Sequence, residues 1–384
     1  MLFRSGFYNG SWIDISTPIN YPIGPDGDHK LCVIGQDDAG NIQLQSDATT
    51  YQWTKDTVAP TATIGGGPTN PSSDANLNAT VSGTGVVDYQ YKLVSGASAC
   101  TGGGYNGSWI AIATPITDAI GADGDYKLCV IGRDAADNAQ TEASASQHTW
   151  TRDSTAPTAT ITNGPANPSN DTSLNVSVSG TGVLDYQYKI VSGASLCTGG
   201  SYNGSWIAVA TAITDAIGAD GDYKLCVIGR DNAANAQTEA SASTYTWTKD
   251  TSEPTSGDVV LGGQTSPGPQ DSNLNVDVGG TNIDSYQYKI VDQSQPCTGG
   301  GYNGTWIDAS INITAATGAD GDYKLCIITQ DTAGNIQDES DATTIVWTKD
   351  TTPPLATIAG EPTGSSNTIV LDVTVAGTDV SHYQ

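Results

Sequence analysis

Three pairs of cysteines recur along the chain, each with the same separation of 29 residues. This spacing predicts one disulfide in each of several repeated units and an oxidising compartment. The seventh cysteine, Cys32, would need a mate at Phe3, so it is predicted to be unpaired, and the sequence is expected to begin inside a unit. The predicted disulfides are Cys100–Cys129, Cys197–Cys226 and Cys297–Cys326.

The repeat is defined by the motif Tyr-Asn-Gly-Ser/Thr-Trp. It starts at Tyr8, Tyr105, Tyr202 and Tyr302, which gives periods of 97, 97 and 100 residues. Such a period is too long for a solenoid unit and matches a small domain with its own core. The predicted modules are a partial one over 1–56 (C-terminal half), complete ones over 57–153, 154–250 and 251–350, and a partial one over 351–384 (N-terminal half).

The net charge limits the partners of the chain. With 41 acidic and 14 basic side chains, the formal charge is -27, which repels nucleic-acid phosphates and anionic lipid. No run of about 18 apolar residues occurs, so no membrane insertion is expected in this segment. The first residues lack the apolar stretch of a secretory signal, whereas the cysteines indicate export. Both observations agree if the signal lies upstream in a longer exported protein.

Short β-forming runs within residues 57–153 alternate with clusters of Gly, Pro, Asn and Asp. No stretch has a sustained helical period, so the fold is predicted to be all-β with almost no helix. The best fit is a tandem array of immunoglobulin-like or fibronectin-III-like β-sandwich modules. The strands expected in this module are 61–64, 77–82, 88–94, 109–113, 126–132 and 148–151, with a seventh near Ile116.

Strand alternation predicts where the cysteine of the long strand points. Tyr126, Leu128 and Val130 share one face of this strand, so Cys129 points to the other face. If the tyrosine face is the core, the disulfide differs from the buried inter-sheet bond of antibody domains. It is then expected to tie the loop 100–104 onto the outside of the same sheet.

The joints between modules are expected to bend little. Each module ends on an aspartate that is followed within four residues by a proline, which restricts φ and favours extended backbone. The array should therefore form an elongated rod, on the order of 100 to 150 Å long for three complete modules. These residues are Asp56 and Pro60, Asp153 and Pro157, Asp250 and Pro254, and Asp350 with Pro353 and Pro354.

The loop Asp-x-x-x-Asn before the last strand of each module has two interpretations. Asp, Gly and Asn are the expected residues of a hairpin turn, which we favour and which requires no cofactor. The alternative is a Ca2+ site, in which oxygens of this loop, the Asp-Gly-Asp loop and the linker surround a hard cation. The residues of this candidate metal site are Asp134, Asn138, Asp153, Asp231, Asn235, Asp250, Asp331, Asn335 and Asp350.

Two further motifs have both a structural and a binding interpretation. Exposed tryptophans would stack on sugars, although aromatics in small β domains are more often packing residues. Asn-Gly-Ser/Thr matches the N-glycosylation pattern, and Asn-Gly is also a tight-turn signal. We favour packing and turns. The candidate glycan-binding residues are Trp109, Trp206 and Trp306, and the glycosylation motifs start at Asn9, Asn106, Asn203 and Asn303.

No catalytic site is predicted from the titratable residues. The histidines, His29, His148 and His382, fall at non-equivalent positions of the repeat, so no general base recurs in register. Because the other cysteines have matching partners, neither a zinc cluster nor a Cys/His nucleophile is supported.

The segment 347–354 reads Trp-Thr-Lys-Asp-Thr-Thr-Pro-Pro, and the loop 331–335 reads Asp-Thr-Ala-Gly-Asn. In these motifs the chain resembles the tandem bacterial immunoglobulin-like repeats of large surface and secreted proteins. The family has an Asp-x-Ala-Gly-Asn turn before the last strand and an Asp-Thr-x-x-Pro joint after it. This chain departs from the simplest members in its cysteine pairs and in Asp137 or Ala234 replacing the turn glycine. The resemblance implies stalks, adhesins and accessory regions of exopolymer-degrading enzymes.

The sequence therefore predicts a non-catalytic, extracellular or cell-surface stalk of a bacterial adhesin-like protein. Its partners would be the neighbouring modules of the same longer chain. One alternative is that the modules themselves bind glycans or another cell surface. Another alternative is the accessory region of a secreted polysaccharide-degrading enzyme.

The two ends of the sequence correspond to complementary halves of a module, since 381–384 aligns with 87–90. We favour the interpretation that the sequence is a fragment of a longer reading frame. The alternative is that the last segment of one molecule completes the first segment of the next by strand addition.

Overall fold

The computed structural model describes residues 8, 10–263, 273–367 and 369–384. Regular structure in these ranges consists of antiparallel strand pairs and four single turns of 3-10 helix. The prediction of an all-β fold with almost no helix is confirmed. The helical turns are η1 (Gln45–Asp47), η2 (Glu142–Ser144), η3 (Glu239–Ser241) and η4 (Glu339–Asp341).

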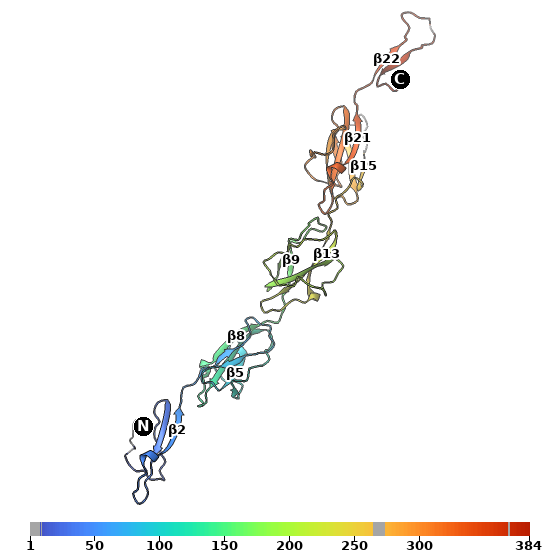
Figure 1. Cartoon of the computed structure of the whole chain (residues 1–384). Helices are drawn as coiled ribbons and strands as arrows, with labels where there is room; N and C mark the ends of the chain where they lie inside the picture. Colours follow the sequence, from blue (N-terminus) through green and yellow to red (C-terminus); the bar gives the residue numbers. More distant parts are fainter. Residues whose placement is uncertain (1–7, 9, 264–272, 368) are drawn as a thin grey trace. The chain divides into compact units, whose positions relative to one another are not determined.

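The predicted module 57–153 contains two antiparallel sheets (Figure 1). The smaller pairs β3 (Thr63–Gly65) with β4 (Thr80–Ser82), and a bridge from Ala79 to Ile116 provides the predicted seventh strand position. The larger sheet has the strand order β6-β5-β7-β8. Its strands coincide with predicted runs and are β5 (Asp88–Ser95), β6 (Ile110–Ala111), β7 (Gly124–Arg133) and β8 (Ser146–Arg152).

One apolar core lies between these two sheets. The large sheet contributes Tyr89, Leu128 and Val130, each 0% exposed, and Trp150. Complete burial of a leucine or valine side chain stabilises the fold by about 1.5–3 kcal/mol. The order β6-β5-β7-β8 opposite β3-β4 is the C′-C-F-G and A-B arrangement of an immunoglobulin-like sandwich. The residues that pack against the large sheet are Ala62, Leu77, Ala79, Val81, Val86, Ile116 and Ile120.

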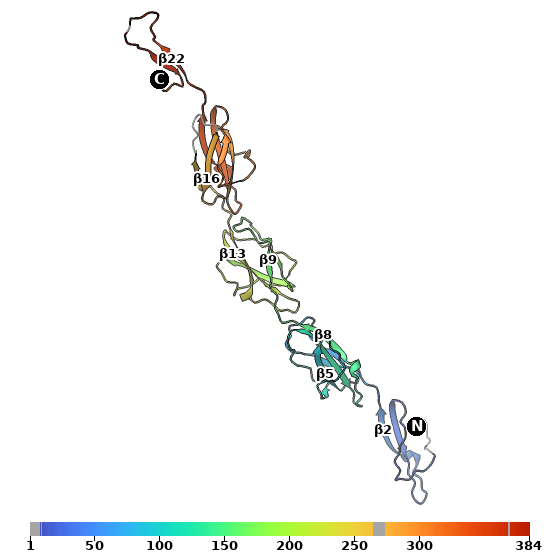
Figure 2. The ribbon, with the colours of Figure 1, turned by 180° about the vertical axis from the view of Figure 1, so that it is seen from behind.

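The predicted modules 154–250 and 251–350 repeat this arrangement of sheets (Figure 2). Each of them has its own core. The first combines β10-β9 with β12-β11-β13-β14, and the second combines β15-β16-β19 with β18-β17-β20-β21. Strands of the first are β9 (Thr160–Thr162), β10 (Ser177–Ser179), β11 (Asp185–Ser192), β12 (Ile207–Ala208), β13 (Gly221–Arg230) and β14 (Ser243–Lys249). Strands of the second are β15 (Val259–Gly263), β16 (Asn273–Gly280), β17 (Ser285–Asp292), β18 (Ile307–Asp308), β19 (Ile313–Ala316), β20 (Gly321–Gln330) and β21 (Thr343–Lys349).

The predicted partial modules each contain one hairpin. In the first, β1 (Gly27–Val33) pairs with β2 (Thr49–Lys55), and in the last, β22 (Leu355–Ala359) pairs with β23 (Thr374–Thr378). Cys32 lies on β1 and is half-buried with a free thiol, as predicted, whereas its equivalent mate position, Phe3, lies outside the described residues.

All three predicted disulfides are present, on the face of the large sheet that is turned away from the sandwich core. The bridge is nevertheless shielded from solvent, since Cys129 is 0% and Cys100 is 5% exposed. Both sides of β7 are therefore buried, and the second side contributes a smaller apolar cluster that was not predicted. It consists of Cys100, Cys129, Ile131 and Ala145 with the half-buried Val94, Tyr105 and Trp109.

Polar contacts hold the glycine-rich loop against the disulfide. The ammonium group of Lys92, a residue only 7% exposed, donates to the carbonyl oxygens of Thr101 at 3.2 Å and Gly103 at 2.8 Å. From the other side, the Glu142 carboxylate accepts the backbone N–H groups of Gly102 at 2.8 Å and Gly103 at 3.1 Å. The loop is thus held by a cation at its carbonyls and an anion at its amides.

Replacement of a core residue of β7 should lower the stability of one module only. Leu128→Ala is expected to cost about 2–5 kcal/mol, because it leaves a cavity between the sheets. Calorimetry of the whole chain would show one transition shifted to lower temperature. Thr149→Ala, at an exposed position of β8, should stay within about 0.5 kcal/mol. Equal effects of the two substitutions would contradict the assigned core face.

Candidate functional site: the joints between modules

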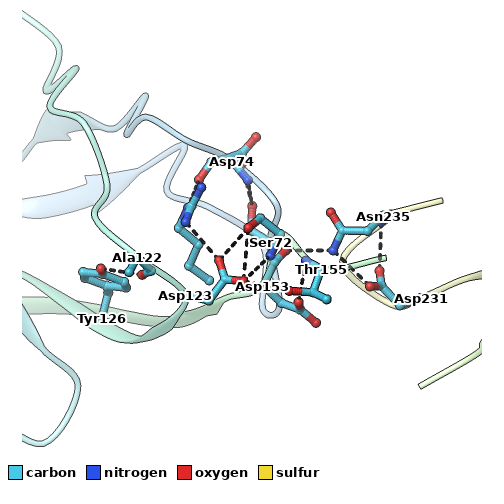
Figure 3. A network of polar contacts seen from close by, with 11 residues as sticks. Ser72, Asp74, Ala122, Asp123, Tyr126, Asp153, Thr155, Asp231 and Asn235 are labelled. Carbon is cyan, nitrogen blue, oxygen red and sulfur yellow. Dashed lines mark hydrogen bonds and ion pairs between the residues drawn. The ribbon is translucent and has the colours of Figure 1, made fainter. Parts of the chain in front are cut away.

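The linker that follows module 57–153 is held by the aspartate loop of the same module (Figure 3). The Asp123 carboxylate accepts the Ser154 N–H at 3.0 Å and the Ser154 hydroxyl at 2.8 Å. It also accepts the Thr155 hydroxyl at 3.2 Å and pairs with Arg152, whose Nη1 lies 2.9 Å from Oδ1. The first linker residues are therefore fixed directly after β8 ends.

All four Asp-Gly-Asp loops make the same contact with the linker. The first aspartate of each loop accepts a backbone N–H from the residue 31 positions later. The second aspartate bonds within its own sheet, as when Asp125 accepts the Thr151 hydroxyl at 2.7 Å. The linker contacts are Asp26 with Thr57, Asp123 with Ser154, Asp220 with Thr251, and Asp320 with Thr351.

These hydrogen bonds favour the charged form of the carboxylates. The backbone N–H and then the hydroxyl of Ser154 lower the pKa of Asp123 from its ordinary value of 3.8. The pKa of Asp220 is lowered chiefly by the Thr251 N–H, and the pKa of Asp320 chiefly by the Thr351 hydroxyl. At neutral pH the acceptors at the joints are therefore fully ionised.

The same linker is also bonded to a loop of the following module. The Asp153 N–H donates to the Ser72 carbonyl at 3.0 Å, whereas the Asp153 carbonyl accepts Nδ2 of Asn235 at 2.8 Å. In addition, Asp153 Oδ1 accepts the Thr155 N–H at 3.0 Å. Figure 3 shows Asp153 with these contacts on both sides. Residues 181–185 and 229–237 accordingly form one compact unit with the chain up to Thr158.

The turn that contains Asn235 is closed by Asp231. One carboxylate oxygen accepts the N–H groups of Ala233 at 2.8 Å and Asn235 at 2.9 Å, and the other accepts Asn235 Nδ2 at 2.9 Å. The hairpin turn favoured from the sequence is thus present, and it also presents an amide to the linker. Equivalent contacts are Asn138 to the Asp56 carbonyl at 3.1 Å and Asn335 to the Asp250 carbonyl at 2.9 Å.

The turn has left-handed backbone where glycine stands in the simplest family members. Asp137 and Ala234 both have φ of 66°, whereas Gly334 at the same position has φ of 92°. The turn geometry is therefore kept in spite of the substitutions, at a local cost that glycine would not have.

The candidate Ca2+ ligands do not form a dense carboxylate cluster. Asp134 and Asp331 each accept hydrogen bonds from their own turns, and Asp350 Oδ1 accepts the Thr352 N–H at 3.0 Å. Over the described part of the chain, no group of three or more His, Cys, Asp or Glu side chains is placed to hold a metal ion. Calcium binding at the joints stays a hypothesis.

The candidate glycan-binding tryptophans are half-buried, and Trp109 and Trp206 lie beside the disulfides of their modules. The guanidinium carbon of Arg133 lies 4.5 Å from the ring centroid of Trp109, so a cation covers one face of that indole. Trp206 packs in the equivalent cluster with Tyr202, and Trp306 is also half-buried. These surroundings favour the packing interpretation.

The Asn-Gly motifs lie in turns. Asn106 is exposed; its Oδ1 accepts the Tyr91 N–H at 2.9 Å, and its Nδ2 donates to the Ser108 carbonyl at 2.8 Å. Gly107 has φ of +77°, which the tight turn requires. Asn203 and Asn303 repeat these bonds, whereas Asn9 lies outside the described residues.

The histidines lie in different surroundings. His148 has a ring nitrogen 2.9 Å from the Pro68 carbonyl and stacks on Trp150, where the next module places Tyr245 on Trp247. A ring nitrogen of His29 lies 3.0 Å from the Pro25 carbonyl, and the ring stacks on Trp53. These contacts give both rings a packing role.

The role of Asp123, Ser154 and their equivalents was missed in the sequence analysis. The Asp-Gly-Asp loops were interpreted as turns, with a calcium site as the alternative, and were not connected to a linker hydrogen bond. The signal was available, since an Asp-Gly-Asp motif precedes Asp-Thr or Asp-Ser by a fixed distance in all four repeats.

Comparison with known proteins gives fold-level similarity only. No family model and no curated protein match the chain. Similar solved structures include fibronectin(III)-like modules of Clostridium thermocellum CbhA, with 16% identity, 49% of this chain and 93% of that chain covered, and a TM-score of 0.30. A tetra-tandem repeat in the extending region of a large adhesion protein has 16% identity, coverage of 85% and 82%, and a TM-score of 0.26.

A third similar structure is a Ca2+-stabilized adhesin that helps an Antarctic bacterium bind ice, with 15% identity, coverage of 84% and 81%, and a TM-score of 0.31. At these scores, the assignment of the fold rests on the sheets and cores described above. Among the described residues, no helix has the length and apolarity to span a membrane.

Acid should weaken the joints. Because the folded pKa of Asp123 is lowered, its hydrogen bonds contribute stability above the unfolded value near 3.8, and this contribution is lost as the pH falls through the folded pKa. Carboxyl NMR titration should give Asp123 a pKa below its ordinary value. Ser154→Ala, which removes the hydroxyl donor, should raise that pKa. An unchanged titration midpoint in the variant would contradict the contact.

Removal of the amide that reaches the linker should loosen the joint. Asn235→Ala is expected to cost about 0.5–1.5 kcal/mol and to speed hydrogen exchange at the Ser154 and Thr155 amides. Asn41→Ala is the matched control, because Asn41 bonds to Asp37 within the same kind of turn and contacts no linker carbonyl in the described structure. If Asn235→Ala leaves exchange at both linker amides as it is, the contact has no role in ordering the joint.

Proposed function

We propose that this chain is a non-catalytic structural spacer in an extracellular or cell-surface protein of adhesin type. The repeated sandwich modules, the disulfides and the acidic surface all support a load-resisting segment outside the cytoplasm. This is also the role that the resemblance to bacterial immunoglobulin-like repeats implies.

The observation that carries this proposal is the double attachment of the linkers. Ser154 and Thr155 are bonded to Asp123 on one side, and Asn235 binds the carbonyl of Asp153 on the other. A flexible tether would leave its backbone groups to water, whereas here consecutive linker residues have protein partners. Because the same contacts recur at successive joints, the array is suited to transmit position and tension.

Partners follow from this role. The first partners are further modules of the same longer chain, joined through the same Asp-Gly-Asp and Asp-x-x-x-Asn contacts. A binding tip or an enzyme domain held away from the cell wall would supply the target specificity. Glycan binding by the modules themselves has weaker support, because Arg133 covers Trp109 and the tryptophans are half-buried.

The spacer proposal is tested by loosening the joints together. The triple variant Asn138→Ala, Asn235→Ala and Asn335→Ala should show a smaller average maximum dimension by small-angle X-ray scattering, because freed linkers sample bent arrangements. Asn41→Ala should match the unmodified chain. Scattering profiles that coincide for all three proteins would remove the observation on which the proposal rests.

A glycan array tests the alternative function. The whole chain should give no signal on the array. A glycan signal that is lost in Trp109→Ala would instead favour glycan recognition.

A further inference from the structure

The disulfide divides each complete module into two mechanically different lengths of chain. This inference rests on the proposed spacer function, because it concerns a module pulled through its two linkers. Cys100 follows β5, and Cys129 lies within β7, so residues 101–128 form a closed covalent loop. Tension from the first linker reaches Cys100, crosses the sulfur bridge and continues from Cys129 to the second linker.

We propose that the disulfide sets a fixed extension limit for each complete module. The bridged loop contains 29 Cα–Cα steps, which is about 100 Å of extended chain at about 3.3–3.6 Å per residue. The bridge itself spans only 5.7 Å between Cα atoms. When the sheets of a module separate, the bridge therefore withholds about three tenths of the module's residues from the extended chain. The other two disulfides close loops of the same separation, so the length of chain that is withheld is the same in all three modules.

The position of the loop in the sheet gives this limit a second consequence. Strand β7 pairs with β5 on one side and β8 on the other, and its first half, from Gly124 to Leu128, lies inside the loop together with β6. When β5 and β8 are pulled away, β7 stays tethered close to the end of β5 through Cys100. The retained loop reduces the entropy that must be lost on re-forming the β5–β7 pair. The module should therefore refold faster than one without the bridge.

Burial protects the disulfides from reduction while a module is folded. Thiol–disulfide exchange requires a thiolate to reach a sulfur atom of the bridge, yet Cys129, Cys226 and Cys326 are each 0% exposed. Their partners differ, since Cys100 is 5% exposed whereas Cys197 and Cys297 are half-buried. Protection should thus be greatest in module 57–153, although equivalent Lys and Glu contacts hold the glycine-rich loop in all three modules.

Reduction of the disulfide by an external dithiol would remove the extension limit. The reductant gives two electrons and two protons to the bridge, becomes a disulfide itself and leaves Cys100 and Cys129 as thiols. In the folded state the buried sulfurs oppose this reaction. Once the sheets have separated under tension, the bridge is exposed, and reduction adds a second extension step.

Single-molecule force extension of the whole chain tests the proposal. Cys32→Ser serves as the background, because it prevents links between molecules through the free thiol. Without reductant, each module opening should lengthen the chain by one increment, and dithiothreitol under load should then add about 100 Å per module. In the matched variant Cys100→Ala with Cys129→Ala, one opening should be longer by the same amount and two should be unchanged.

Increments without reductant that already equal the full module length, or that dithiothreitol leaves unchanged, would overturn the proposal. If the variant module fails to fold, one opening is lost, and the reductant measurement on the unmodified modules still decides. The spacer function is tested separately, by the scattering of the joint variants. The increments depend only on where the disulfides lie in the path of tension.

Discussion

The alternation of side chains along β7 is the constraint on which the structure of each module depends. Leu128 and Val130 enter the sandwich core, while Cys129 and Ile131 face the opposite side and pack beneath the glycine-rich loop. A shift of one residue in the pairing of this strand would exchange the two sets, so that a cysteine faced the core and lost its mate. The hydrophobic core and the covalent bridge therefore specify the same register from opposite faces of one strand.

The same strand also determines how one module is joined to the next. The Asp-Gly-Asp loop begins β7, and its first aspartate holds the linker that follows β8, so the strand pair that builds the core also positions the joint. The next module then supplies an asparagine from a turn whose geometry is set by its own aspartate. A turn motif that serves hairpin closure thus also joins modules at Asp56, Asp153 and Asp250.

Much of this fold could be predicted from the sequence because its signals are local and periodic. Alternation with period two assigned Leu128 and Cys129 to opposite faces, and the repeat length gave the unit that buries its own core. The predicted strand 77–82 is longer than β4, because Leu77 and Ala79 lie in the core but pair only through isolated contacts. The start of β7 was placed too late, because Gly124 and Asp125 suggest a turn and yet pair with β8.

The candidate site could be predicted only in part. The composition of the Asp231 loop favoured a turn over a cation site, and the structure shows the turn, but the direction of the Asn235 amide depends on a linker that is distant in sequence. The shielding of the disulfide by Lys92, Glu142 and Trp109 likewise depends on three separate segments meeting over one strand.

Peptide mapping by mass spectrometry, after proteolysis without reductant, tests the pairing of β7 with the glycine-rich loop most directly. The linked pairs should be Cys100–Cys129, Cys197–Cys226 and Cys297–Cys326, with a free thiol at Cys32. Free thiols at the paired positions, or links between different modules, would show that the assigned register and bridges are wrong.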